Sequence, residues 1–406
     1  MIRAVLTGLI LASSSAAWAS PAEDYVTFST ALVISQACGG LKYLEHTRTQ
    51  GAVFTALNST PQSSQVQDGR LSEDDYKQFV VDLDARAQAQ AQSVGCTQTA
   101  MPYIMAAKAY AAADIYRSLV HAFNFEGAYD VTTRMVLGAD RKSAALRFDG
   151  YLQQLYGANF PAFAARQREQ AIGELPMVNP FDSGLGATAS PPTSPEDLSK
   201  ISDLQTMANI ALDEVFFEVT AEVAGFIVRP RPLAEQWIIP ELRRADSPNV
   251  EGMPVVVLPR SDLVDFTPDD QDLSEKLYSL MALTPEGHLR VMFYGDTAQL
   301  LTDPTVRLLV RTEPLPVGAS KYDYFEQPGF RETTVSFNGV PVQQNCLGAP
   351  CFDFPPEATE AFVGLEDMDA ELFVSHLPDA EPPAEYDSYK PGRVSNFYAV
   401  KLMAEQ

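Results

Sequence analysis

The fold is decided by residues 194–228, which read SPEDLSKISDLQTMANIALDEVFFEVTAEVAGFIV. The Ser-Pro pair followed by two acids is typical of a helix N-terminus. Apolar residues then recur along one side at helical spacing; they are Leu198, Ile201, Leu204, Leu212, Val215, Val219 and Val223. The stretch predicts a long amphipathic helix that ends before Arg229 and, at 1.5 Å per residue, spans roughly 50 Å. Such a helix either packs across a sheet or joins two halves of a molecule.

After this helix the apolar pattern changes from helical to extended. The expected strands cover residues 254–258, 278–283, 289–294, 306–311, 333–337, 340–344, 372–376 and 397–402. A Thr-Pro-Glu-Gly turn is expected at residues 284–287, and Asn338-Gly339 is the strongest hairpin signal in the chain. Short strands after one long helix favour an α+β domain with a mostly antiparallel sheet over residues 194–406.

Before this helix, residues 20–175 have a helical pattern. The expected helices run from residue 20 toward residue 44, from 72 to 95, from 101 to 123, from 140 onward and from 160 to 175, with a polar loop over residues 47–69. Ser20-Pro21-Ala22-Glu23 is a capping box for the first helix, and Gly95 is placed to end the second. The sequence predicts a helical bundle domain here. Residues 176–193, rich in Pro, Gly and Ser, predict a linker between the domains.

The N-terminal residues 1–19 have the pattern of a secretory signal peptide. Arg3 gives a positive start, residues 4–12 are mostly apolar, and Ala17-Trp18-Ala19 is a small-x-small cleavage signature. The apolar run is too short to span a bilayer. We therefore expect an exported protein, periplasmic or secreted, with no transmembrane segment in the mature chain.

Export determines how the four cysteines are interpreted, because oxidising compartments favour disulfides. The simplest pairing joins Cys38 to Cys96 and Cys346 to Cys351, one bridge in each expected domain, although other pairings are formally possible. The spacings do not suit zinc or a thioredoxin-type redox motif. No cofactor is expected.

The chain is strongly acidic, with 53 Asp+Glu against 29 Lys+Arg and a net charge of −24. This charge disfavours a nucleic-acid partner. Residues 20–175 have a net charge of −3 and residues 176–406 of −22, and twelve acids with no Lys or Arg lie between Glu332 and Tyr389. Three interpretations stay open: a solvated surface, a docking face for a basic partner, and a calcium site with Asp367, Asp369 and Glu371 as candidate ligands.

Catalytic signatures are absent from the sequence: there is no Gly-x-Ser-x-Gly, Walker or His-Glu-x-x-His motif. His46 and His121 are expected to be structural or surface residues, and His288 to be exposed where it opens a strand. His376 ends an expected strand in the acidic stretch, so an envelope hydrolase with His376, Asp369 and Asp387 as candidate catalytic residues is an alternative. The leading hypothesis is a non-enzymatic binding protein that recognises another envelope protein or an extracellular ligand.

Overall fold

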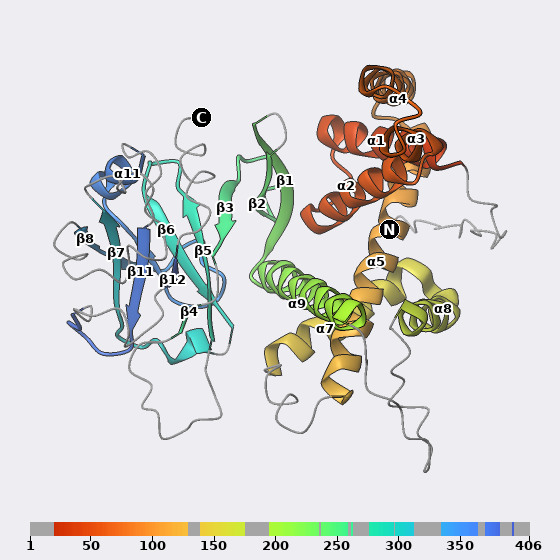
Figure 1. The fold of residues 1–406 in the computed structure, drawn as a ribbon. Helices are drawn as coiled ribbons and strands as arrows, with labels where there is room; N and C mark the ends of the chain where they lie inside the picture. The colour runs from red at the N-terminus through yellow and green to blue at the C-terminus, as the bar shows by residue number, and fades with distance from the viewer. Residues whose placement is uncertain are drawn as a thin grey trace, which may run out of the picture. The chain divides into compact units, whose positions relative to one another are not determined.

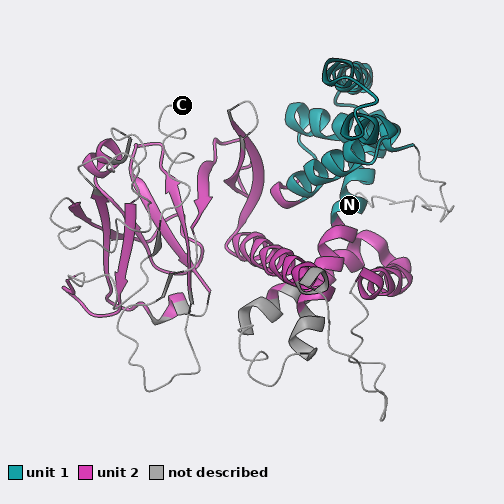
Figure 2. Cartoon of the chain, in the orientation of Figure 1, with its two compact units in different colours: residues 1–41, 45–111 teal, residues 42–44, 112–406 magenta. Residues whose placement is uncertain are grey.

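The computed structural model describes residues 20–128, 139–174, 195–234, 237–258, 261–262, 276–295, 297–311, 334–363, 370–381 and 392–393. The expected signal peptide and linker lie outside these ranges. The chain forms two compact units (Figure 2): unit 1 comprises residues 1–41 and 45–111, and unit 2 residues 42–44 and 112–406. The chain passes between them at residues 41–45 and again at residues 111–112, inside a helix, and the domain limits expected from the sequence stay a prediction.

Unit 1 is entirely helical where it is described. Its elements are α1 (Pro21–Cys38), α2 (Tyr43–Asn58), α3 (Pro61–Gln67), α4 (Glu73–Val94), η1 (Gln98–Ala100) and the first part of α5 (Met101–Ala128). Apolar side chains of α1, α2 and α4 bury one core, and those of α1, α4 and α5 a second. The predicted Cys38–Cys96 disulfide joins the end of α1 to the residues after α4, with a Cα–Cα distance of 5.5 Å.

Two expectations for unit 1 are wrong. The first helix does not continue past Gly39-Gly40, because Gly39 adopts a left-handed φ of 73° and ends α1 at Cys38. Residues 47–69 are not a loop: α2 and α3 occupy them. The helical pattern is hidden there because the buried positions carry small or polar residues, including His46, Thr49 and Ala52.

Helix caps agree with the sequence at α4 but not at α1. The Ser72 hydroxyl accepts a hydrogen bond from the Asp75 N–H at 3.1 Å, and Gly95 ends α4 with a φ of 53°. At α1 the Ser20 side chain makes no capping bond, so the expected capping box does not form, although the helix begins at Pro21. The proline at the first helical position is sufficient to fix the start of this helix.

The described helices of unit 2 before its first strand are the remainder of α5, α7 (Ala139–Tyr156), η2 (Gly157–Asn159), α8 (Phe160–Glu174) and α9 (Pro195–Val223); η3 (Thr297–Leu300) and α11 (Pro356–Val363) lie between strands. Ile115, Leu152, Phe163 and Leu212, one from each of the first four α-helices, lie in one buried cluster. The long helix predicted from residues 194–228 is α9. No helix in the described ranges is long and apolar enough to span a membrane.

The strands of unit 2 form two sheets in which every pair is antiparallel. They are β1 (Phe226–Ala234), β2 (Trp237–Arg244), β3 (Met253–Val257), β4 (Ser261–Asp262), β5 (Lys276–Leu283), β6 (Leu289–Tyr294), β7 (Thr305–Arg311), β8 (Thr334–Asn338), β9 (Val340–Val342), β10 (Cys351–Asp353), β11 (Ala370–Ser375) and β12 (Gly392–Arg393). The larger sheet has the order β1-β2-β3-β5-β6-β10-β9, with β4 on β5, and the smaller one β12-β11-β7-β8. The predicted α+β architecture is confirmed.

The larger sheet is buried on both faces (Figure 1). On one face, Phe216 and Phe217 of α9 pack against strand residues such as Val255 and Met292. On the other face, residues such as Met281 meet the inner side of β7 and β11, and helix α11 (Pro356–Val363) contributes Ala358. Unit 2 is therefore layered as helix, larger sheet and smaller sheet, and α9 packs across a sheet.

Two strand expectations need correction. The long helix was expected to continue to residue 228, but α9 ends at Val223, and residues 226–228 together with the Pro-rich residues after them form β1, which pairs with β2. Asn338-Gly339 does not make a hairpin: β8 pairs with β7 in the smaller sheet, whereas β9 pairs with β10 in the larger one. The chain changes sheets at Gly339. The expected strand at 397–402 lies outside the described residues.

Candidate functional site

The corner at Gly339 joins two edge strands that belong to different sheets. The Gly339 N–H donates to the Val306 carbonyl of β7 at 2.8 Å. A Cβ at this position would lie 2.9 Å from the Phe352 Cβ of β10 and 3.2 Å from the Val306 carbonyl oxygen. Only glycine fits between the two sheets without moving backbone. The corner therefore fixes where β8 and β9 lie on their sheets.

β8 directs alternate main-chain groups to β7 and away from it. In an antiparallel pair, the N–H and C=O groups of successive residues point alternately toward the partner strand and away from it. The Gly339 N–H points to β7, so the main-chain groups of Phe337 and Val335 also point to β7. Ser336 and Asn338 consequently direct their N–H and C=O groups outward. Both residues are exposed. Within the described ranges neither has a further main-chain partner. We call the outward-facing side of residues 335–338 the open edge of β8.

The open edge carries no charge. No Asp, Glu, Lys, Arg or His occurs between Thr333 and Phe352. Val335 is 42% exposed and Val340, just beyond the corner, 60%. Natural proteins usually protect an edge strand with charges, proline or a bulge, because its free N–H and C=O groups otherwise pair with another chain. β8 has none of these protections.

The other sheet edges differ from β8. β1 carries Pro230 and Pro232 among arginines. At the two ends of β10, the Phe354 N–H donates to β6 and the Pro350 carbonyl accepts a hydrogen bond from β6. Main-chain groups alternate along a strand, so Cys351 and Asp353 are the β10 residues that bond to β9. Pro341 of β9 lies between their partners and therefore faces outward. The described part of β12 is two residues long. Among the described edges, β8 is the one suited to accept a further strand.

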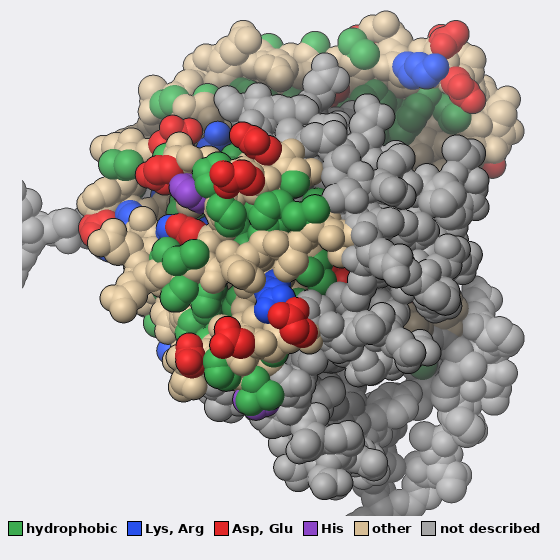
Figure 3. Space-filling model, turned by 90° about the vertical axis from the view of Figure 1, so that its left-hand side faces the viewer, with side chains coloured by type: hydrophobic (Ala, Val, Ile, Leu, Met, Phe, Trp, Pro, Cys, Tyr) green, Lys and Arg blue, Asp and Glu red, His purple; other side chains and the backbone are tan. Residues whose placement is uncertain are grey.

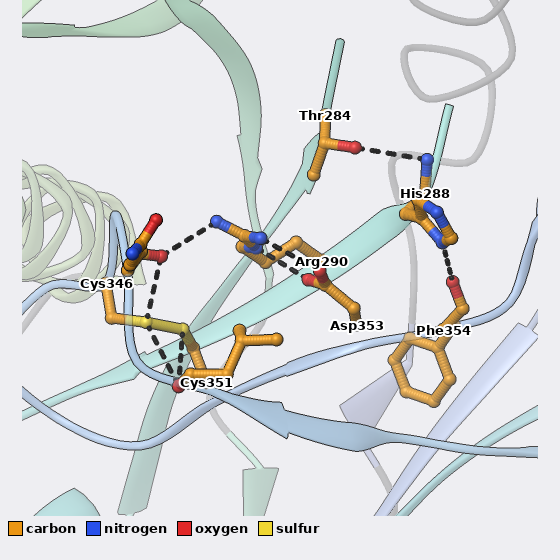
Figure 4. A network of polar contacts seen from close by, with 9 residues as sticks. Thr284, His288, Arg290, Cys346, Cys351, Asp353 and Phe354 are labelled. Atoms are coloured by element: carbon orange, nitrogen blue, oxygen red, sulfur yellow. Dashed lines mark hydrogen bonds and ion pairs between the residues drawn. A yellow bond between two sulfur atoms is a disulfide. The ribbon is translucent and has the colours of Figure 1, made fainter. Parts of the chain in front are cut away.

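A polar network holds the strands next to the corner (Figure 4). Arg290 on β6 forms a bidentate ion pair with Asp353 on β10, with N–O distances of 2.6 and 2.8 Å, and also donates to the Gln344 carbonyl at 3.0 Å. The predicted disulfide Cys346–Cys351 closes the turn between β9 and β10, with a Cα–Cα distance of 5.9 Å. The ion pair and the disulfide therefore link β6, β10 and the turn that follows β9.

The same view shows why His288 is only half exposed. Its main-chain N–H donates to the Thr284 hydroxyl at 3.2 Å, and its Nδ1 lies 3.0 Å from the Phe354 carbonyl oxygen, to which it donates. The expected turn at residues 284–287 is present, with the Gly287 N–H donating to the Thr284 carbonyl. His288 was expected to be exposed, and this local hydrogen bonding explains the difference. Its role here is structural.

Only two of the candidate catalytic or calcium-binding residues expected from the sequence lie in the described part of the chain. His376 follows β11 directly and is half exposed, beside Ser375, whose hydroxyl accepts the Leu377 N–H at 3.0 Å. Glu371 lies on β11 and is 1% exposed, so it belongs to the interior of the smaller sheet. The other candidates, Asp367, Asp369 and Asp387, lie outside the described residues. The catalytic and calcium hypotheses therefore stay predictions. No group of three potential metal ligands occurs in the described part of the chain.

The remaining histidines are structural, and one has an unexpected setting. His121 Nε2 lies 2.9 Å from a Glu174 carboxylate oxygen. His46 is completely buried, and among the described residues neither ring nitrogen has a hydrogen-bond partner. Burial lowers the pKa of His46 to about 4. From the sequence, His46 was expected near the end of the first helix, as a structural or surface residue, and no signal pointed to its complete burial.

Hydrophobic and acidic side chains share one face of the molecule (Figure 3). The view is toward the side on which β7, β8 and α11 are labelled in Figure 1, and it shows hydrophobic side chains across the middle with acidic ones above and below. Comparisons of the chain with known protein families, with curated proteins and with solved structures find no match. Its function is therefore inferred from the open edge of β8.

Proposed function

We propose that this is an exported, disulfide-stabilised binding protein that accepts an extended segment of a partner protein along the open edge of β8. The observation that carries the proposal is the outward direction of the Ser336 and Asn338 main-chain groups on an edge strand without charge, proline or bulge. Strand addition is a common way to bind extended peptides: main-chain hydrogen bonds provide affinity, and side-chain contacts provide specificity.

The size of the open edge suggests a modest affinity. Two residues offer two N–H donors and two carbonyl acceptors, and each added hydrogen bond contributes about 1 kcal/mol net. Contact with the exposed Val335 and Val340 side chains adds apolar burial, at about 25 cal/mol per Å². These contributions amount to only a few kcal/mol and immobilising the partner segment reduces them, so we expect dissociation constants on the order of millimolar or weaker for a segment that pairs with these two residues alone.

An exported location is supported by the sequence and by the bonding of the cysteines. Residues 1–19 have the pattern of a signal peptide. The structure contains two disulfides and no free cysteine among the described residues. Disulfides persist mainly outside the cytoplasm. We therefore place the binding activity in the periplasm or outside the cell, with another envelope protein as the natural source of the bound segment.

The substitution Ser336→Pro tests the open edge directly. Proline removes the outward N–H and leaves the hydrogen bonds to β7 in place, so the fold should tolerate it as other edge strands tolerate proline. In an extract of its own envelope, the mature wild-type protein should run as a larger species than the purified chain, and Ser336→Pro should run as a monomer. Equal thermal unfolding of both proteins controls for folding.

Ser336→Thr is the matched control, because threonine retains the N–H and has a high strand propensity. It should behave as the wild type. A larger species that forms equally well with Ser336→Pro, or a wild-type protein that is monomeric in the extract, contradicts the proposal.

A further inference from the structure

The charge pattern around the open edge bears on the chemistry of the segment it accepts. The uncharged residues 333–352 are bracketed by Glu332 and Asp353. From Glu332 to Tyr389 the chain contains Asp and Glu but no Lys or Arg. The strand offered for pairing is therefore an uncharged island within an acidic stretch of the chain.

Apart from Glu371, which is buried on β11, the described acids of this stretch fall into two groups. Asp353 and Glu381 are paired with Arg290 and Arg307. By contrast, Glu357 and Glu360 on α11 and Asp379 after β11 are exposed, and no ion pair joins them to another described residue. Within the described part of the chain, no Lys or Arg neutralises their charge. Unpaired surface carboxylates attract a positively charged partner and speed its association.

We propose that the segment bound at the open edge has uncharged, β-branched or aromatic residues in its middle and lysine or arginine at both ends. This inference rests on the proposed function. The middle of the segment lies against Val335 and the partly buried Phe337, where a charge would lose hydration without gaining a partner.

The ends of the segment extend toward acidic side chains. Asp379 precedes Ala380, whose N–H donates to Thr305 beside the Asn338 end of the strand pair, where Arg307 is already paired with Glu381. Helix α11, with Glu357 and Glu360, contacts β7 and lies at one end of it (Figure 1).

The same charges argue against a second copy of this chain as the occupant. Each copy has a net charge of −24, of which −22 belongs to residues 176–406. Two copies joined through β8 would bring two acidic surfaces together, and like charges across an interface oppose association. The acidic surface that disfavours pairing between two copies attracts a basic segment.

Two fluorescent peptides with one shared middle test the inference. They are acetylated Lys-Lys-Thr-Val-Thr-Val-Thr-Lys-Lys and its counterpart with Glu in place of every Lys, each titrated with the mature wild-type protein and followed by fluorescence anisotropy. We expect the Lys peptide to bind at least about tenfold more tightly at low salt, with the ratio falling as salt screens the charges. Ser336→Pro should abolish this binding, and Ser336→Thr should retain it.

A third peptide, Lys-Lys-Thr-Val-Pro-Val-Thr-Lys-Lys, separates strand pairing from attraction to the acidic surface. It keeps the charge but cannot pair as a continuous strand, so it should not bind. Equal binding of the Lys and Glu peptides, abolished by Ser336→Pro, would overturn the inference about charge and leave the proposed function standing.

The remaining outcomes concern the proposed function or the choice of occupant. Failure of the Lys and Glu peptides to bind, or binding that persists in Ser336→Pro, would overturn the proposed function. Sedimentation of the purified wild-type protein as a dimer that Ser336→Pro dissociates would identify a second copy as the occupant and overturn the inference of a basic segment.

Discussion

The buried imidazole of His46 shows how a single residue links folding to pH. Its side chain is completely buried in α2, and burial lowers its pKa from 6.5 to about 4. The unfolded chain therefore binds a proton near pH 6.5 that the folded protein does not bind until near pH 4. The stability contributed by the neutral imidazole is complete above pH 6.5 and is lost as the pH falls toward 4.

We predict that replacing His46 by leucine removes this pH-dependent component. For the wild type the free energy of unfolding should fall by about 3 kcal/mol between pH 7 and pH 4 through His46 alone, in addition to the contribution of carboxylates. Urea unfolding of both proteins at several pH values measures the difference, because the carboxylates are common to both. Identical pH dependence in His46→Leu and wild type would show that the burial of His46 does not act in this way.

The sequence predicted the pairing of the cysteines but not the structural surroundings of His46 and Ser336. The cysteine pairs could be predicted because an exported chain with two separated pairs has a simple solution. His46 could not, because nothing local distinguishes a buried imidazole from a surface one. Ser336 is a similar case: its importance arises because β8 has a partner on only one side among the described strands, and no residue pattern reports that.

At the scale of elements, the Cys38–Cys96 bridge connects the ends of α1 and α4 across 58 residues, whereas Cys346–Cys351 spans only 5. A disulfide restricts the unfolded chain more strongly when it closes a longer loop. Both cysteines of the longer bridge are exposed at the surface of unit 1. The two bridges therefore differ in the stability that they contribute.

We predict that the double substitution of Cys38 and Cys96 by serine lowers the stability of the protein by roughly 4 kcal/mol, and that the same change at Cys346 and Cys351 costs about 2 kcal/mol. Denaturant unfolding followed by circular dichroism compares the two variants with the wild type. An equal or larger loss for the shorter bridge would mean that loop closure does not dominate, and that local packing around Cys351 does.

Elements with a strong, local period were predictable and the others were not. α4 has caps and regular apolar spacing, so both its ends agree with the sequence to within a residue, whereas α9 agrees only at its start: it ends at Val223, five residues before the expected end. β1 was missed because its two prolines resemble a chain break, although an edge strand tolerates them. The Asn338-Gly339 pair was assigned to a hairpin, but the glycine serves a close approach between two sheets.

At the scale of the whole molecule, the strand order of unit 2 decides where binding is possible. The fold class followed from the change of period after α9, but strand order depends on contacts between residues far apart in sequence. The open edge of β8 is a product of that order. The sequence therefore predicted the acidic surface and the absence of catalytic motifs, and the structure was needed to locate the open edge.

The most direct test of the central proposal is residue-resolved amide hydrogen exchange of the mature protein with and without the Lys-flanked peptide. We expect slower exchange, by about tenfold or more, at Ser336 and Asn338, whose N–H groups would become bonded to the peptide. Exchange at Phe337 should change little, because its N–H faces β7 in the free protein. Unchanged exchange at Ser336 and Asn338 while the peptide is bound would show that the peptide does not pair with the open edge of β8.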